Sequence, residues 1–186
     1  DRIYKTYQEM AEKESTRPDG IDVVSIVTPN HLHVPIAKIF AEKGIHIICD
    51  KPIGMSSEEA IDLKKVIESK KLIFALTHNY TGYPMVRHAR SLVQKGDLGS
   101  LRVIQAEYPQ DWLTTKAEGS GLKQAEWRTD PNRSGAGGCI GDIGTHAYNL
   151  IRFITGLEVD EISADIHTFV VGRKVDDNAQ IMLRFK

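Results

Sequence analysis

The stretch DVVSIVTPN, residues 22–30, decides the fold expected for this chain. It is rich in β-branched residues and ends at Pro29, which cannot donate to a central ladder, so it predicts a strand over 22–28. Similar apolar runs predict strands over 45–49 (IHIIC) and 72–77 (LIFALT), with helices over 33–43 and 56–69 between them. Strands that alternate with helices are typical of a parallel sheet covered on both faces.

The pattern changes after a predicted helix over 83–95, which Gly96 ends. Strands are expected over 101–108, 162–171 and 179–185, a helix over 142–155, and a polar segment without a clear period over 109–134. Consecutive strands with few helices favour an open, mostly antiparallel sheet. We therefore predict an α/β part over 1–80 and an α+β part over 81–186, each of them partial.

The patterns at both ends of the chain predict a helix and a strand that the sequence cuts short. Ile3, Tyr7 and Met10 recur at helical spacing, so the chain is expected to open within a helix, and the last residues alternate like a strand. We expect the 186 residues to be an internal section of a longer protein.

Composition excludes several classes of function. The net charge of −1, without a basic block, gives no footprint for nucleic acid. No apolar run approaches the roughly 18 residues that a membrane span needs, so no membrane partner is expected. Cys49 and Cys139 form no CxxC motif, and two lone thiols favour a cytoplasmic location over a disulfide scaffold.

The first polar motif is TPNHLH, residues 28–33, at the carboxyl end of a predicted strand. Ligands of open α/β sheets bind outside those ends, so Thr28 and Asn30 are candidate ligand contacts. The alternative is an ordinary turn in which Asn or His caps the next helix. His31 and His33 form an HxH pair without a nearby third ligand, so no metal site is predicted.

The second motif is CDKP, residues 49–52, after the next predicted strand. Lys51 on the rim of a parallel sheet, beside Asp50, is a candidate catalytic or substrate-binding cation. A surface ion pair before a proline turn explains the same residues.

The third motif, residues 137–153, joins a glycine-rich segment to a helix. Asp142 and His146 stand four residues apart and would share a helix face. A carboxylate beside an imidazole can orient a general base. The alternative is a helix start at which Asp142 favours the macrodipole and His146 is a surface residue.

Together the motifs resemble the Gfo/Idh/MocA family of NAD(P)-dependent oxidoreductases. The order is TPNxxH, then [E/D]KP, then WRxDPxxxGxGGxxxDxGxH before a helix that ends in TG. The resemblance implies a Rossmann-type domain over 1–80 and an α+β substrate and oligomerisation domain over 81–186. It implies NAD or NADP as cofactor, a sugar, inositol or related polyol as substrate, and a homo-oligomer assembled through the second-domain sheet. The family's GxGxxG phosphate turn is not among these residues.

The resemblance also implies roles for individual residues. His146 would take the hydroxyl proton, Lys51 would hold the reacting oxygen, and Asp142 would stabilise the imidazolium or bind a substrate hydroxyl. Asp50 stands where the family usually has Glu, which shortens its reach by one methylene. Expected cofactor contacts are Thr28, Pro29, Asn30, His33, Asp50, Lys51, Pro52, Asn79 and Arg128. Expected substrate contacts are Lys51, Trp127, Asp142 and His146.

Two alternatives to a dehydrogenase stay open. Relatives of this family use tightly held NAD for transient oxidation during glycoside cleavage or epimerisation. A non-catalytic, sugar-binding homologue could keep the same fold, since fold does not by itself imply function. The resemblance does not choose between NAD and NADP, and it does not name the sugar or polyol.

Overall fold

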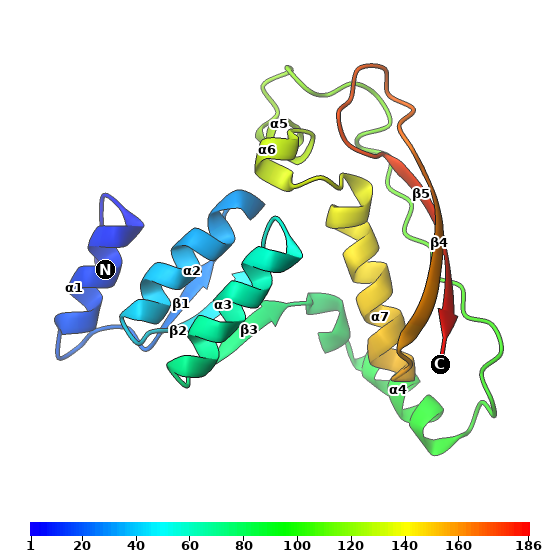
Figure 1. Cartoon of the computed structure of the whole chain (residues 1–186), viewed down its shortest axis with the longest axis horizontal. Coiled ribbons are helices and arrows are strands. Elements are labelled where there is room, and N and C mark those ends of the chain that lie inside the picture. The colour runs from blue at the N-terminus through cyan, green and yellow to red at the C-terminus, as the bar shows by residue number, and fades with distance from the viewer. The chain divides into compact units, whose positions relative to one another are not determined.

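A computed structural model describes all residues from Asp1 to Lys186 and divides them into two compact units, Asp1–Thr77 and His78–Lys186. Figure 1 shows the helices and strands of both units. None of the helices combines the length and the apolar character that a membrane span requires.

Unit 1 contains a three-stranded parallel sheet in the order β1-β2-β3. Its strands are β1 (Val23–Ile26), β2 (His46–Asp50) and β3 (Phe74–Thr77). Its helices are α1 (Tyr7–Thr16), α2 (His33–Glu42) and α3 (Ser57–Ser69), with a short 3-10 turn η1 (Asn30–Leu32) before α2. The predicted α/β sheet is confirmed, and its elements lie within a few residues of the predicted ranges.

The local sequence explains where α3 begins. The Ser56 side chain accepts from the Glu59 amide at 3.3 Å, and the Glu59 carboxylate accepts from the Met55 amide at 2.9 Å. These reciprocal bonds satisfy amide groups that a helix start leaves without partners. The capping motif therefore fixes the entry to α3 independently of tertiary contacts.

The helices of unit 1 cover one face of the sheet, not both as predicted. Val24 and Ile26 of β1 and Ile47 of β2 are buried, together with Phe40 of α2 and Leu63 of α3. The alternate residues of the same strands face away, and Val23 and Ile48 are 45% and 38% exposed. Both crossovers run in the same direction along the sheet, and right-handed crossovers then place α2 and α3 on the same side.

Unit 2 begins with the 3-10 turn η2 (Asn79–Gly82) and helix α4 (Pro84–Lys95), which ends at Gly96 in the left-handed conformation, with φ 77°. Two short helices follow, α5 (Lys123–Arg128) and α6 (Pro131–Ser134). The π-helical segment η3 (Ile140–Gly144) then runs directly into α7 (Thr145–Thr155). Helix α7 packs against α4, where the Arg90 guanidinium lies 4.5 Å from the centre of the Phe153 ring.

Unit 2 ends in an antiparallel pair, β4 (Val159–His167) and β5 (Asn178–Phe185), joined by residues 168–177. The pair confirms the predicted antiparallel character of the second part. The expected strand over 101–108 is wrong, because these residues form no ladder and Val103 is 86% exposed. Alternation alone does not make a strand when no neighbouring backbone accepts and donates its hydrogen bonds.

The chain does not open within a helix. Helix α1 begins at Tyr7, and the Thr6 side chain caps it by accepting from the Glu9 amide at 3.1 Å. Ile3, counted in the helical pattern, lies before this cap and is 95% exposed. The cap therefore overrides the apolar spacing that suggested an earlier start.

Candidate functional site

The carboxyl ends of the three parallel strands in unit 1 lie at one edge of the sheet. Ile26 pairs with Cys49, and Cys49 pairs with Leu76, so the residues that follow leave the sheet side by side. The Thr77 hydroxyl donates to Asp50 Oδ1 at 2.6 Å and holds that carboxylate at this edge. Polar groups of separate strands thus meet where α/β sheets bind their ligands.

The loop after β1 carries a buried hydroxyl without a protein partner. Thr28 Oγ1 is inaccessible to solvent and makes no hydrogen bond. Pro29 follows it, and Asn30 is buried at the start of η1. Buried polar atoms almost always find a partner in a protein or a ligand. Thr28 Oγ1 is therefore suited to a polar group of a bound molecule.

His33 joins two of the loops at this edge. Its Nε2 lies 2.8 Å from the Thr28 carbonyl oxygen, and its Nδ1 lies 2.7 Å from the Pro52 carbonyl oxygen. Both partners are carbonyl oxygens, so each contact is one in which a ring N–H can donate. The ring is 1% exposed. Its observed contacts tie the loop after β1 to the Lys51–Pro52 segment, and its contact with a cofactor stays a prediction.

Lys51 begins the segment that connects β2 to α3. The Lys51–Pro52 peptide bond is cis, and Lys51 is half-buried beside Asp50. The Pro52 carbonyl, held by His33, fixes the path of the chain after Lys51. The backbone of Lys51 is therefore anchored by β2 before it and by the contact between Pro52 and His33 after it.

In unit 2, the predicted residues Trp127, Arg128 and Asp142 lie together. Arg128 Nε donates to Asp142 Oδ2 at 3.1 Å, and both side chains are about one-quarter exposed. The Arg128 guanidinium lies 4.2 Å from the centre of the Trp127 ring and also hydrogen-bonds Gln124. The Asp142 carboxylate is thereby paired with a cation and held in one place.

The rings of His78 and Tyr80 contact His146. His146 is buried in the first turn of α7, and its ring centre lies 4.6 Å from that of Tyr80. The His78 ring meets it edge-on, with 6.1 Å between centres. The Tyr80 hydroxyl also hydrogen-bonds the Tyr108 hydroxyl. This bond and burial raise the pKa of Tyr80 to about 12, so the hydroxyl stays neutral.

Sequence reasoning missed the aromatic residues of this site. The Tyr80 ring contacts His146, and the Tyr108 ring contacts Tyr80. The Arg128 guanidinium lies 5.9 Å from the centre of the Trp112 ring. The available signal was the aromatic content of residues 78–83, HNYTGY, directly after β3. Asn79, which was predicted from that segment, is exposed at the start of η2.

The predicted residues thus divide between the two units. Unit 1 carries Thr28, Pro29, Asn30, His33, Asp50, Lys51 and Pro52. Unit 2 carries Asn79, Trp127, Arg128, Asp142 and His146.

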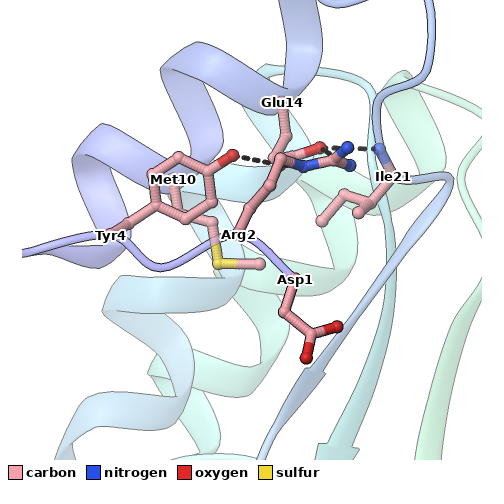
Figure 2. A pocket seen from close by; sticks show the side chains of 6 residues that line it. All are labelled: Asp1, Arg2, Tyr4, Met10, Glu14 and Ile21. Carbon is pink, nitrogen blue, oxygen red and sulfur yellow. Dashed lines mark hydrogen bonds and ion pairs between the residues drawn. The ribbon is translucent and has the colours of Figure 1, made fainter.

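A cavity of about 390 Å³ lies in unit 1, and none of the predicted site residues lines it. Figure 2 shows its wall, in which the Glu14 carboxylate faces Arg2, Tyr4 and the Ile21 amide. Hydrogen bonds from Arg2 and Tyr4 lower the pKa of Glu14, so it stays ionised. A Cβ on Gly20 would lie 2.0 Å from the Glu14 carbonyl oxygen, so only glycine fits there. The contacts of this wall hold α1 against the entrance to β1.

Profiles of two protein-family domains match the chain. Residues 2–78 match the oxidoreductase family with an NAD-binding Rossmann fold, and residues 86–186 match the GFO/IDH/MocA C-terminal domain. Curated relatives include an uncharacterized oxidoreductase, YfiI, of Bacillus subtilis, which is 34% identical over the whole of this chain. Levoglucosan dehydrogenase of Pseudarthrobacter phenanthrenivorans is 33% identical over 84% of the chain. The chain spans 48% and 38% of these two proteins.

Solved structures give the same result. An oxidoreductase from Sinorhizobium meliloti is 46% identical, with a TM-score of 0.83, over all of this chain and 46% of its own. An inositol dehydrogenase homologue from Azotobacter vinelandii, complexed with NAD⁺, is 28% identical, with a TM-score of 0.89, over all of this chain and 48% of its own. The chain therefore belongs to the Gfo/Idh/MocA family, with its NAD-binding Rossmann fold in residues 2–78 and its C-terminal domain in residues 86–186.

Proposed function

We propose that the protein carrying this chain is an NAD(P)-dependent dehydrogenase that oxidises a CH–OH group of a sugar, inositol or related polyol. The observation that carries the proposal is the polar carboxyl edge of the β1-β2-β3 sheet within the NAD-binding part of the chain. Thr28 Oγ1, buried there without a partner, suits a hydroxyl or phosphate group of the cofactor. Relatives named for levoglucosan, D-xylose and glucose 6-phosphate support the substrate class.

The bound nicotinamide supplies a hydride acceptor, and the chain supplies geometry and proton handling. His146 takes the proton of the substrate hydroxyl as the carbon loses its hydride, and the products are a carbonyl and an imidazolium. Lys51 stabilises the negative charge that develops on the oxygen. Asp142, held by Arg128, binds a second hydroxyl of the substrate or stabilises the imidazolium. Trp127 lies against Arg128 and positions the substrate beside them.

A panel of sugars, inositols and polyols, assayed with NAD and NADP in parallel, tests the reaction. Net accumulation of reduced cofactor in proportion to substrate is expected. His146→Ala should lower kcat by about 10²–10⁴-fold, whereas His88→Ala, on the exposed surface of α4, should leave it unchanged. Lys51→Ala should weaken both substrate binding and turnover. Turnover of a sugar without net reduction would assign the transient-oxidation reaction instead, and binding without any reduction would assign a non-catalytic role.

We further propose that the β4–β5 pair takes part in a homo-oligomer contact. Ile162 pairs with Leu183, and Ala164 pairs with Ile181, so these side chains share one apolar face. Ile162 is 68% exposed. Ile162→Asp should shift the mass measured by light scattering towards the monomer, and an unchanged mass would remove this face from the interface.

A further inference from the structure

Asp176, in the β4–β5 connection, reaches the glycine-rich turn that precedes η3. Its Oδ1 accepts from the Gly138 amide at 2.6 Å, and its Oδ2 accepts from the Ile140 amide at 2.8 Å. The Cys139 thiol donates to the same Oδ2 at 2.9 Å, and the Cys139 amide donates to the Asp176 carbonyl oxygen at 2.9 Å. One residue thus binds three consecutive residues of the turn through four hydrogen bonds.

The sequence of the turn suits this close approach. A Cβ on Gly138 would lie 2.1 Å from the Asp176 carbonyl oxygen and 2.7 Å from a methyl group of Val175. Glycine is therefore required at 138 for the two main chains to meet. The carboxylate accepts from amide groups that would otherwise lack partners at the start of a helix, and such charge-assisted bonds are short and strong.

The turn leads directly into the residues proposed to act on the substrate. Asp142 lies two residues after Ile140, and its amide donates to the Gly138 carbonyl at 3.0 Å. His146 follows one turn later in α7. The intervening segment is a single stretch of π-helix, a form that occurs mostly as one turn within an α-helix and often at functional sites. The direction of the Asp142 and His146 side chains therefore depends on what fixes the first residues of this segment.

The connection that carries Asp176 is itself anchored. The Arg173 side chain is 1% exposed and forms ion pairs with Glu118 and Asp177. The same guanidinium donates to the Leu113 carbonyl at 2.8 Å, and Val175 is buried beside Asp176. Asp176 is thus held by contacts on both of its sides, as a group that sets the position of another must be.

We propose that Asp176 is a positioning residue that sets the register of η3 and thereby the placement of Asp142 and His146. It acts through the backbone of residues 138–140 and does not itself touch the substrate. The consequence for turnover rests on the proposed dehydrogenase function, whereas the effect on the backbone does not.

Asp176→Asn in the protein that carries this chain tests the proposal, with Asp165→Asn as the matched control on the exposed surface of β4. Asparagine has an NH₂ group in place of one carboxylate oxygen, so it cannot accept a backbone bond at both the Oδ1 and the Oδ2 positions. Hydrogen exchange at the Gly138 and Ile140 amides should accelerate by about 10-fold or more. With the best substrate, kcat should fall by about 100-fold, while the KM for the nicotinamide cofactor stays nearly unchanged.

The two readouts separate this proposal from the proposed function. Accelerated exchange together with lost turnover supports a positioning role, and accelerated exchange in a protein that oxidises no substrate refutes only the dehydrogenase assignment. Wild-type exchange, or accelerated exchange with wild-type kcat, would overturn the positioning role. If Asp176→Asn does not fold, Asp176→Glu, which keeps the charge but misplaces its oxygens, should give a folded protein with lowered kcat, and wild-type kcat there would also overturn it.

Discussion

The Tyr80 hydroxyl and the Cys139 thiol both lie where the neutral form is favoured. The hydrogen bond to Tyr108, together with burial, raises the pKa of Tyr80 to about 12. Burial, followed by the hydrogen bond to the Asp176 carboxylate, raises the pKa of Cys139 to about 12. Neither residue was a predicted site residue. Tyr80 contacts His146, the proposed general base, and Cys139 contacts Asp176, the proposed positioning residue.

Tyr80 is expected to act on His146 through its ring rather than its hydroxyl. Tyr80→Phe keeps the ring that lies 4.6 Å from the His146 ring, so kcat should stay within about threefold, with a stability loss of about 1 kcal/mol for the hydrogen bond to Tyr108. Tyr80→Ala removes the ring contact, and kcat should fall by about 10-fold or more. Steady-state kinetics on both variants separate the two contributions, and equal losses would assign the role to the hydroxyl.

Cys139 should resist alkylation in the folded protein. A thiol with a pKa of about 12 ionises far less at about pH 8 than an ordinary cysteine, so iodoacetamide should modify it on the order of 10³-fold more slowly than in the urea-unfolded chain. Peptide mass spectrometry distinguishes it from the buried Cys49. Modification of Cys139 at the rate of the unfolded chain would mean that the bond to Asp176 does not protect the thiol.

At the scale of elements, His33 shows how the start of one helix ties two loops together. The residue begins α2, and its ring bonds the carbonyl of Thr28, after β1, and the carbonyl of Pro52, after β2. The neighbouring histidine, His31, has a buried Nδ1 without a partner. Two histidines of one motif therefore have different structural roles.

Replacing His33 should destabilise the protein more than replacing His31. His33→Phe removes the ring nitrogens that contact the Thr28 and Pro52 carbonyl oxygens, at a cost of about 1–3 kcal/mol of unfolding free energy for each carbonyl that loses a donor. His31→Phe removes no hydrogen bond at Nδ1 and should cost less than about 1 kcal/mol. Urea unfolding of both variants measures the difference. Equal losses would show that the two carbonyl bonds contribute little.

At the scale of the whole molecule, the two units differ in what stabilises them. The apolar core, with Phe40, Ile47 and Leu63 at its centre, lies entirely in unit 1. Unit 2 buries few apolar side chains and contains the Arg173 network instead. The hydrogen bond from Arg173 lowers the pKa of Glu118 from its ordinary value of 4.5 to about 2. The stability of unit 2 should therefore depend on pH.

Acid should destabilise unit 2 through this pair. Because the pKa of Glu118 is depressed by folding, its contribution is complete above about pH 4.5 and is lost as the pH falls towards about 2. Both tryptophans, Trp112 and Trp127, belong to unit 2, so their fluorescence reports its unfolding. Glu118→Gln should flatten the acid transition, while Glu161→Gln, in an exposed pair with Arg184, should not. A transition unchanged by Glu118→Gln would exclude the pair as its cause.

Much of the fold could be predicted from local sequence, because local interactions determine it. Ser56 and Glu59 fix the start of α3, and Gly96 fixes the end of α4, through contacts between residues only a few positions apart in sequence. The expected strand over 101–108 is wrong because a ladder depends on a distant partner strand, which alternation along the sequence does not reveal. The predicted motif residues stay predictions as ligand contacts, although the pairing of Arg128 with Asp142 places two of them together.

The sequence by itself determined the alternation of β1, α2, β2, α3 and β3, the order of the three polar motifs and the family to which they point. These features depend on residue type and spacing along the chain. Only the tertiary structure revealed that Asp176 holds the turn before Asp142, that Arg173 pairs with Glu118, and that Tyr80 lies against His146. These contacts join residues about 35 to 65 positions apart in several cases, and such proximity follows from chain folding and side-chain packing, which no local pattern encodes.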